Sequence, residues 1–140
     1  LTSRHLSHGK MKIQAKIIKI LRGKGLKILN LGSDDDERVD YPDYAHKMVE
    51  EIIEGSALKG ILICGTGIGM SIAANRSSSI RAALCVNEYM AEYSRLHNNA
   101  NVLVLGSKLV EDEISLKIVN KFLETQFEGG RHARRLGKIV

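Results

Sequence analysis

A glycine-rich segment offers the clearest chemistry in this sequence. Residues 64–71 read Cys-Gly-Thr-Gly-Ile-Gly-Met-Ser. Alternating glycines let a chain fold so tightly that successive backbone N–H groups point inward beside a helix start, where they stabilise a phosphate or a developing oxyanion. The spacing matches neither the dinucleotide fingerprint nor the P-loop, which requires a Lys-Ser or Lys-Thr pair. A simple tight turn after a strand is the alternative.

Cys64 lies at the mouth of this predicted nest. Inward N–H groups and a helix start favour a thiolate, and a thiolate in that position is suited to taking a proton. The other cysteine, Cys85, falls inside an apolar run, where a thiol is usually an inert small hydrophobe. The residues alone leave the same inert role open for Cys64.

Two further groups are candidates for the same chemistry. Tyr89, Tyr93 and His97 are spaced four residues apart, so they share one face of a predicted helix. A neutral imidazole can accept and donate a proton near pH 7, although a lone histidine is more often structural. Asn98, beside it, could donate a hydrogen bond to an oxyanion.

Arg131 and Arg135 follow a Glu-Gly-Gly segment and lie one predicted helical turn apart. Such a pair can grip a phosphate through forked hydrogen bonds, and a solvated basic tail is the alternative. The spacing of histidines and cysteines matches no zinc motif, so we expect no metal.

Alternating strand and helix patterns predict the elements that position these groups. The predicted strands are residues 26–31, 60–64, 80–86 and 102–105, and the predicted helices are residues 11–21, 44–53, 71–75, 87–96 and 111–127. A first strand would belong within residues 1–10, which do not have a strand pattern. The alternation predicts a parallel α/β sheet, in which ligands bind beyond the carboxyl ends of the strands. Cys64, Gly65 and Gly106 fall at such ends.

Composition narrows the class of protein. The 140 residues, 44% apolar and 26% charged, suit one domain over residues 1–140 with a single core. The net charge of +5 fits a small anionic substrate better than a nucleic acid, because four tyrosines and two phenylalanines make no stacking platform. No apolar run approaches the ~20 residues that span a bilayer. Two cysteines without a disulfide pattern predict a cytoplasmic protein.

Together, these segments resemble the family of ribose-5-phosphate isomerase B and galactose-6-phosphate isomerase. The resemblance covers residues 26–139 and is carried by Asp40-Tyr41-Pro42, residues 60–75, Ile80-Arg81-Ala82-Ala83, Arg95-Leu96-His97-Asn98, Ala100-Asn101-Val102-Leu103 and Glu128-Gly129-Gly130-Arg131-His132. It implies a three-layer α/β/α sandwich with a mainly parallel, Rossmann-like or flavodoxin-like sheet. It also implies a homodimer or tetramer with active sites at the subunit interface, and no cofactor.

The resemblance also implies a role for each site residue. Cys64 is the base that moves a proton between C1 and C2, Thr66 assists transfer between the oxygens, and His97 opens the sugar ring. The anion hole comprises the backbone of Gly65, Gly67, Ile68, Gly69, Met70 and Ser71, together with Asn98. Tyr41 contacts the sugar, and Arg131 and Arg135 hold the phosphate. In one branch of the family a glutamate base stands where this chain has Met70, so the cysteine branch is indicated.

The chain departs from the family pattern in two places. The family's first strand ends in Ser-Asp-His-Ala-Gly, whose Asp and His help to bind sugar and phosphate. Aligned without gaps, this chain offers Ser7-His8-Gly9-Lys10, which keeps the histidine at His8 and lacks the Asp; a gapped alignment would use His5. Lys108 stands where the family often has an arginine, and it supplies charge without the planar fork.

The predicted function is interconversion of D-ribose 5-phosphate and D-ribulose 5-phosphate through an enediol, a step of the non-oxidative pentose phosphate pathway. One alternative is an isomerase of a six-carbon sugar phosphate, such as allose 6-phosphate or galactose 6-phosphate, which would differ in pocket length. A second is a non-catalytic phosphate-binding module, against which Cys64, His97 and the arginines argue together. A third, nucleic-acid binding, predicts steep salt dependence.

Overall fold

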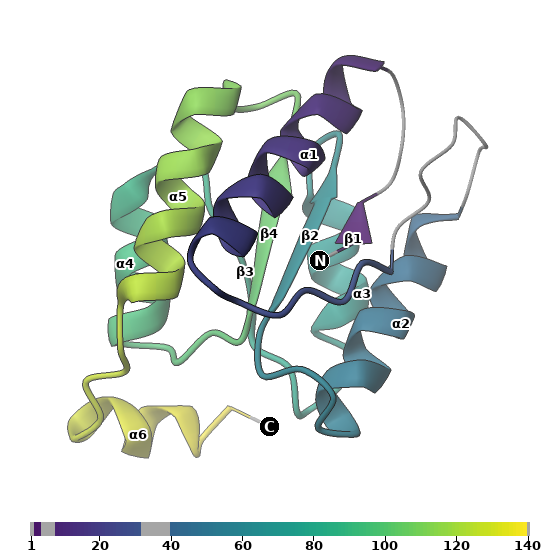
Figure 1. Ribbon diagram of the computed structural model, residues 1–140. Coiled ribbons are helices and arrows are strands. Elements are labelled where there is room, and N and C mark those ends of the chain that lie inside the picture. The colour runs from purple at the N-terminus through teal and green to yellow at the C-terminus, as the bar shows by residue number, and fades with distance from the viewer. Residues whose placement is uncertain (1, 4–7, 32–39, 140) are drawn as a thin grey trace.

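Strands and helices alternate along most of the chain in the computed structural model, which describes residues 2–3, 8–31 and 40–139 (Figure 1). The elements are β1 (Thr2–Ser3), α1 (His8–Gly23), α2 (Tyr41–Ile53), β2 (Gly60–Cys64), α3 (Ile68–Ala74), β3 (Ala82–Leu84), α4 (Glu88–Leu96), β4 (Val102–Gly106), α5 (Asp112–Glu124) and α6 (Arg131–Leu136). The strands form one parallel sheet in the order β1-β2-β4-β3.

The two central strands divide the core into two halves. Every residue of β2 and β4 is buried, and alternate residues along a strand point to opposite faces of the sheet. Ile61 and Ile63 pack with α1, α4 and α5 on one face. Leu62 and Cys64 pack with α2 and α3 on the other. The predicted three-layer α/β/α sandwich is therefore confirmed, and the Cys64 side chain belongs to the α2 and α3 side.

The predicted strand at residues 26–31 is wrong, because this segment has no regular secondary structure. Its side chains do not alternate between a buried and an exposed face, because Leu26 and Leu29 are both exposed while Ile28 packs on the core. In the described sheet the edge strands are β1 and β3, with two and three residues. They offer a further strand only a short edge for pairing. The short strand β1, paired at Leu62 and Ile63, lies where the sequence shows no strand pattern.

Several boundaries differ from the prediction by a few residues. The second helix begins at Tyr41 because Pro42 suits a first helical turn. The third begins at Ile68, directly after Gly67 caps it in the left-handed conformation. Asn87 caps α4 as predicted, its side-chain oxygen accepting a hydrogen bond from the Met90 N–H at 2.8 Å. Among the described residues, no helix combines the length and the apolar character that crossing a bilayer requires.

Candidate active site

Cys64 ends β2, and its thiol contacts the glycine-rich turn directly. The side chain is buried, with 7% of the residue exposed. The backbone N–H of Gly67 donates a hydrogen bond to Cys64 Sγ at 3.1 Å. This hydrogen bond ties the thiol to the turn that follows it. For the other cysteine, burial raises the pKa of Cys85 to about 11, as expected of an inert thiol.

The turn is too crowded for any residue but glycine at two positions. Gly67 has a φ of +79°, and a Cβ there would lie 2.7 Å from Leu84 Cδ1. At Gly69, a Cβ would lie 2.5 Å from the ring of Tyr41. The Tyr41 phenol therefore lies directly against the nest, where it can contact a ligand bound there.

Fewer backbone N–H groups of the nest are free than the sequence suggests. The Ile68 N–H donates to Thr66 Oγ1 at 3.3 Å, and the Ser71 N–H donates to Gly67 O within α3. The first turn of a helix leaves its N–H groups without intrahelical acceptors. The N–H groups of Gly69 and Met70 are therefore the ones best placed for an anion. The Met70 side chain itself is fully buried in the core.

A second loop, after β4, holds the nest in place. Ser107 donates to the carbonyl oxygen of Cys64 through its N–H at 2.8 Å and its hydroxyl at 3.2 Å. The Lys108 N–H donates to Gly65 O at 2.9 Å. A Cβ at Gly106 would lie 2.5 Å from Thr66 O, so glycine is required for this close approach. Cys64, Thr66, Lys108 and the nest thus lie together at the carboxyl ends of β2 and β4.

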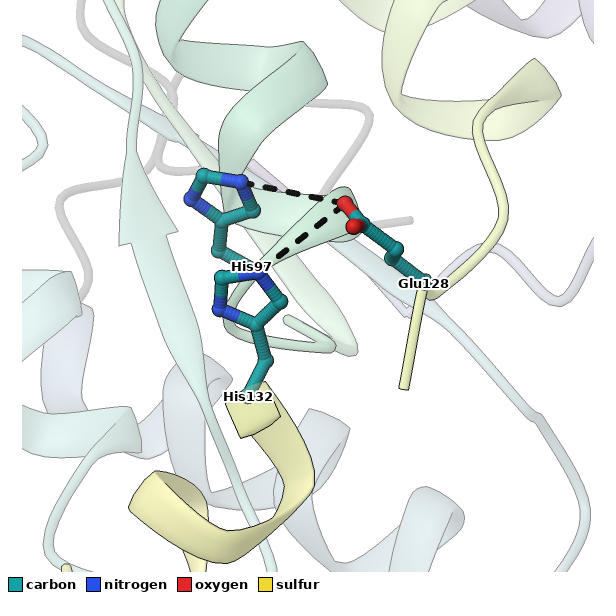
Figure 2. Close-up of side chains that lie close together, drawn as sticks. All are labelled: His97, Glu128 and His132. Carbon is teal, nitrogen blue, oxygen red and sulfur yellow. Dashed lines mark ion pairs between the residues drawn. The ribbon is translucent and has the colours of Figure 1, made fainter. Parts of the chain in front are cut away.

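A separate cluster surrounds His97, the C-cap residue of α4. Its ring contacts Tyr93 edge-on at 4.8 Å, and Tyr93 contacts Tyr89 at 4.4 Å, which confirms the shared helix face. On its other side, His97 stacks on His132, with ring centroids 4.0 Å apart. Figure 2 shows Glu128 beside both imidazoles, with its Oε2 3.9 Å from each Nε2.

Arg95 fixes the turn that carries His97. Its guanidinium is buried, and it donates to Thr125 O at 3.1 Å, to Asn99 Oδ1 at 3.0 Å and to Ala100 O at 2.6 Å. These bonds join the end of α4 to the end of α5, and burial lowers the pKa of Arg95. The predicted residues Asn98, Arg131 and Arg135 belong to this same end of the molecule, with both arginines exposed on α6.

The two clusters do not meet within one chain. Cys64 pairs with Gly106, the last residue of β4, whereas the Gly60 N–H donates to Asn101 O just before β4 begins. The four steps along β2 from Gly60 to Cys64 span about 13 Å. His97, four residues before Asn101, belongs to the Gly60 end of this strand pair, and Cys64 is at the other end. In Figure 1, α6 correspondingly lies below the sheet, while the strands run upward.

One predicted residue lies partly outside what the structure describes. His8 is the first residue of α1, and its side chain is outside the described part of the chain, as are residues 4–7. The sequence pattern did not single out Arg95, Glu128 or His132 as site residues. A weak signal for the last two was present, because residues four apart share one face where the chain is helical.

A glycine nest at the carboxyl edge of a parallel sheet, in a three-layer sandwich, defines an α/β protein that binds small anionic ligands at its sheet edge. The chain belongs to the ribose/galactose isomerase family, whose family model matches residues 6–139.

Known proteins agree with this assignment. Ribose-5-phosphate isomerase B of Escherichia coli is 42% identical over 128 residues, which are 91% of this chain and 86% of that protein. A ribose 5-phosphate isomerase of Thermotoga maritima superposes with a TM-score of 0.92 at 49% identity, covering 99% of this chain and 93% of that one. Ribose-5-phosphate isomerase B of Mycoplasma genitalium, solved with bound ribulose-5-phosphate, superposes with a TM-score of 0.90 at 40% identity, covering 99% and 93%.

Proposed function

We propose that this chain is an aldose–ketose isomerase that interconverts D-ribose 5-phosphate and D-ribulose 5-phosphate through an enediol. The observation that carries the proposal is the 3.1 Å contact between the Gly67 N–H and the Cys64 thiol, inside the nest of a member of this isomerase family. The bound ribulose-5-phosphate of the Mycoplasma genitalium relative supports the choice of substrate.

The chemistry needs one proton to move between neighbouring carbons. The Cys64 thiolate takes the proton from C2 of the open-chain aldose, leaving an enediolate whose negative oxygen is held by N–H groups of the nest. Thr66 passes a proton between the two oxygens, and Cys64 returns its proton to C1. Both groups end the turnover in the state in which they began.

The remaining predicted residues prepare and hold the substrate. His97 opens the furanose ring by moving a proton from the anomeric hydroxyl to the ring oxygen as the bond between C1 and that oxygen breaks, and Asn98 adds a donor for the enediolate. Arg131 and Arg135 bind the phosphate with charge-assisted bonds, and Lys108 adds positive charge near the nest. Tyr41, packed on Gly69, contacts the sugar.

We further propose that two copies of the chain complete each active site. Cys64 and His97 lie at opposite ends of the paired strands β2 and β4. A second chain must therefore supply His97, Asn98 and the α6 arginines to the nest of the first. Exposed apolar side chains on α3 and α4 suit burial in such a homodimer. They are Ile68, Ile72, Tyr89 and Met90. The two free, buried cysteines fit a reducing cytoplasm.

Substrate choice is tested by one coupled assay of ribose 5-phosphate, allose 6-phosphate and galactose 6-phosphate under identical conditions. We expect the highest kcat/KM with ribose 5-phosphate. A higher kcat/KM with either six-carbon sugar phosphate would make that sugar phosphate the substrate. If none of the three is turned over, the chain is a non-catalytic phosphate-binding module.

Subunit sharing is tested by mixing two inactive variants, Cys64→Ala and His97→Asn, after mild unfolding and refolding. If sites are shared, random pairing makes about half of all dimers mixed, and each mixed dimer has one intact site of its two, so about a quarter of wild-type activity with ribose 5-phosphate should return. Sites contained within one chain would give no recovery.

A further inference from the structure

The cluster of His97, Glu128 and His132 contains a buried polar atom that the protein leaves unsatisfied. The His132 side chain is 5% exposed, and among residues 2–3, 8–31 and 40–139 its Nε2 has no hydrogen-bond partner. Glu128 Oε2, at 3.9 Å, is too distant for a hydrogen bond. A buried nitrogen without a partner is destabilising, so it calls for a ligand.

The three side chains offer the atoms that a transition metal prefers. One ring nitrogen of His97, one of His132 and a Glu128 carboxylate oxygen all lie within 4.8 Å of one another. Two histidines and one glutamate, with a fourth position left for water, form a known ligand set for zinc. Figure 2 shows the two rings and the carboxylate grouped around a shared space.

We propose that these three residues bind zinc or a similar divalent transition metal, and that binding there withdraws His97 from ring opening. The metal would occupy the Nε2 lone pair of His97, which then cannot accept a proton. This inhibitory consequence rests on the function proposed above, whereas the metal site itself does not.

The site forms only if the three side chains draw together. Tetrahedral zinc with bonds of about 2.1 Å places its ligand atoms about 3.4 Å apart, so the two 3.9 Å pairs must close by about 0.5 Å. The two histidine nitrogens, which lie within 4.8 Å of each other, must close by up to about 1.4 Å. The rings are stacked, with an interplanar angle of 12°, and each must also turn so that both lone pairs point at one metal. Rotation about the Cβ–Cγ bond of histidine is soft, which permits this turn.

The backbone around residues 128–130 already holds Glu128 and His132 close to His97. The Glu128 N–H donates to Leu96 O at 3.0 Å, which ties Glu128 to the residue before His97. Gly129 and Gly130 have φ values of +75° and +59°, and this left-handed turn brings His132 back beside Glu128.

Equilibrium dialysis of the intact protein against zinc chloride tests the site independently of activity. We expect one zinc per chain, and affinity at least tenfold lower in both Glu128→Gln and His132→Asn. Glu128 is half exposed, so its variant should fold even if the His132 variant does not. His46→Asn, on the exposed face of α2, is the matched histidine control and should bind as the wild type does.

Cys64→Ser separates this site from the thiol, which could also bind zinc. Zinc binding that survives in Cys64→Ser and is lost in Glu128→Gln supports the proposal. Binding that is unchanged in Glu128→Gln, or abolished in Cys64→Ser, overturns the site.

A second measurement tests the inhibition. Zinc at the concentration that saturates the site in dialysis should slow isomerisation of ribose 5-phosphate, and a chelator should restore it. The inhibitory concentration should rise at least tenfold in Glu128→Gln, whatever the basal rate of that variant. If isomerisation proceeds at an unchanged rate when the site is saturated with zinc, the proposed inhibition is wrong. If the protein has no isomerase activity, the proposed function is refuted, but the zinc site is still judged by the dialysis experiment alone.

Discussion

The backbone N–H of Gly67 donates a hydrogen bond to Cys64 Sγ at 3.1 Å across the turn that joins β2 to α3. This contact joins the candidate base to the candidate oxyanion site, since the same turn supplies the thiol and the free N–H groups. The chemistry proposed for the chain depends on that turn more than on any other part of the fold.

Removal of the thiol should abolish most of the turnover. We expect Cys64→Ala to lower kcat by about a hundredfold or more, the usual contribution of a positioned general base, with little change in KM. Initial rates with ribose 5-phosphate measure the effect. Cys85→Ala is the control and should keep its activity. A Cys64→Ala enzyme with more than about a third of wild-type kcat would show that the thiol serves only in packing.

Because Gly67 is crowded, a side chain placed there should lower the free energy of unfolding. Gly67→Ala and Gly55→Ala both place a side chain at positive φ, which costs about 1–2 kcal/mol. A Cβ at Gly55 meets nothing within 4 Å, whereas one at Gly67 collides with Leu84 and Val104. Gly67→Ala should therefore lose a further 1–3 kcal/mol or so of unfolding free energy in urea. Equal losses in the two variants would show that the turn relaxes around the extra methyl group.

His97→Asn should separate ring opening from proton transfer at carbon. The dominant form of ribose 5-phosphate is a closed furanose, whereas ribulose 5-phosphate cannot form that ring and enters the site open. We expect severe slowing with ribose 5-phosphate and much weaker slowing with ribulose 5-phosphate, measured in early single turnovers with product trapped. Equal loss in both directions would place His97 in the enediol step, and no loss would make it a structural helix-end residue.

The arginines of α6 should act on binding. Arg131→Ala and Arg135→Ala each remove charge-assisted bonds to a group that does not react, so KM should rise roughly tenfold to a hundredfold. Arg134→Ala, an exposed arginine on the same short helix, is the matched control and should leave KM near the wild-type value. If KM is normal in both test variants, α6 is only a solvated basic helix.

Local pattern was enough to predict the turn after Cys64 and the parallel α/β sheet, whereas the three-layer sandwich was predicted from the family resemblance. The run at residues 60–64 and the alternating glycines after it specify a buried strand and a tight turn by themselves, and the helix face of Tyr89, Tyr93 and His97 follows from spacing alone. The segment at residues 26–31 shows the limit of this approach, because its pattern contains no information about the length of the strand edge with which it could pair.

The cluster around His97 depends on features that spacing does not specify. Glu128 and His132 meet only because two consecutive glycines adopt positive φ, and Arg95 is buried only because α4 and α5 end side by side. The separation of Cys64 from His97, in contrast, was implicit in the order of elements. Cys64 is the last residue of β2 and His97 precedes β4, and in a parallel sheet the last residue of one strand and the approach to its neighbour lie at opposite ends of the strands.

The loop after β4 links the pairing of β2 and β4 to the position of the candidate site. Ser107 and Lys108 continue the pairing of β2 with β4 past the end of the sheet, onto the carbonyl oxygens of Cys64 and Gly65. A chain in which β4 has not yet aligned along β2 therefore has the thiol and the glycine turn without the hydrogen bonds that hold them in place. Those bonds form only when the two strands pair in register, so the candidate site is assembled late, together with the sheet.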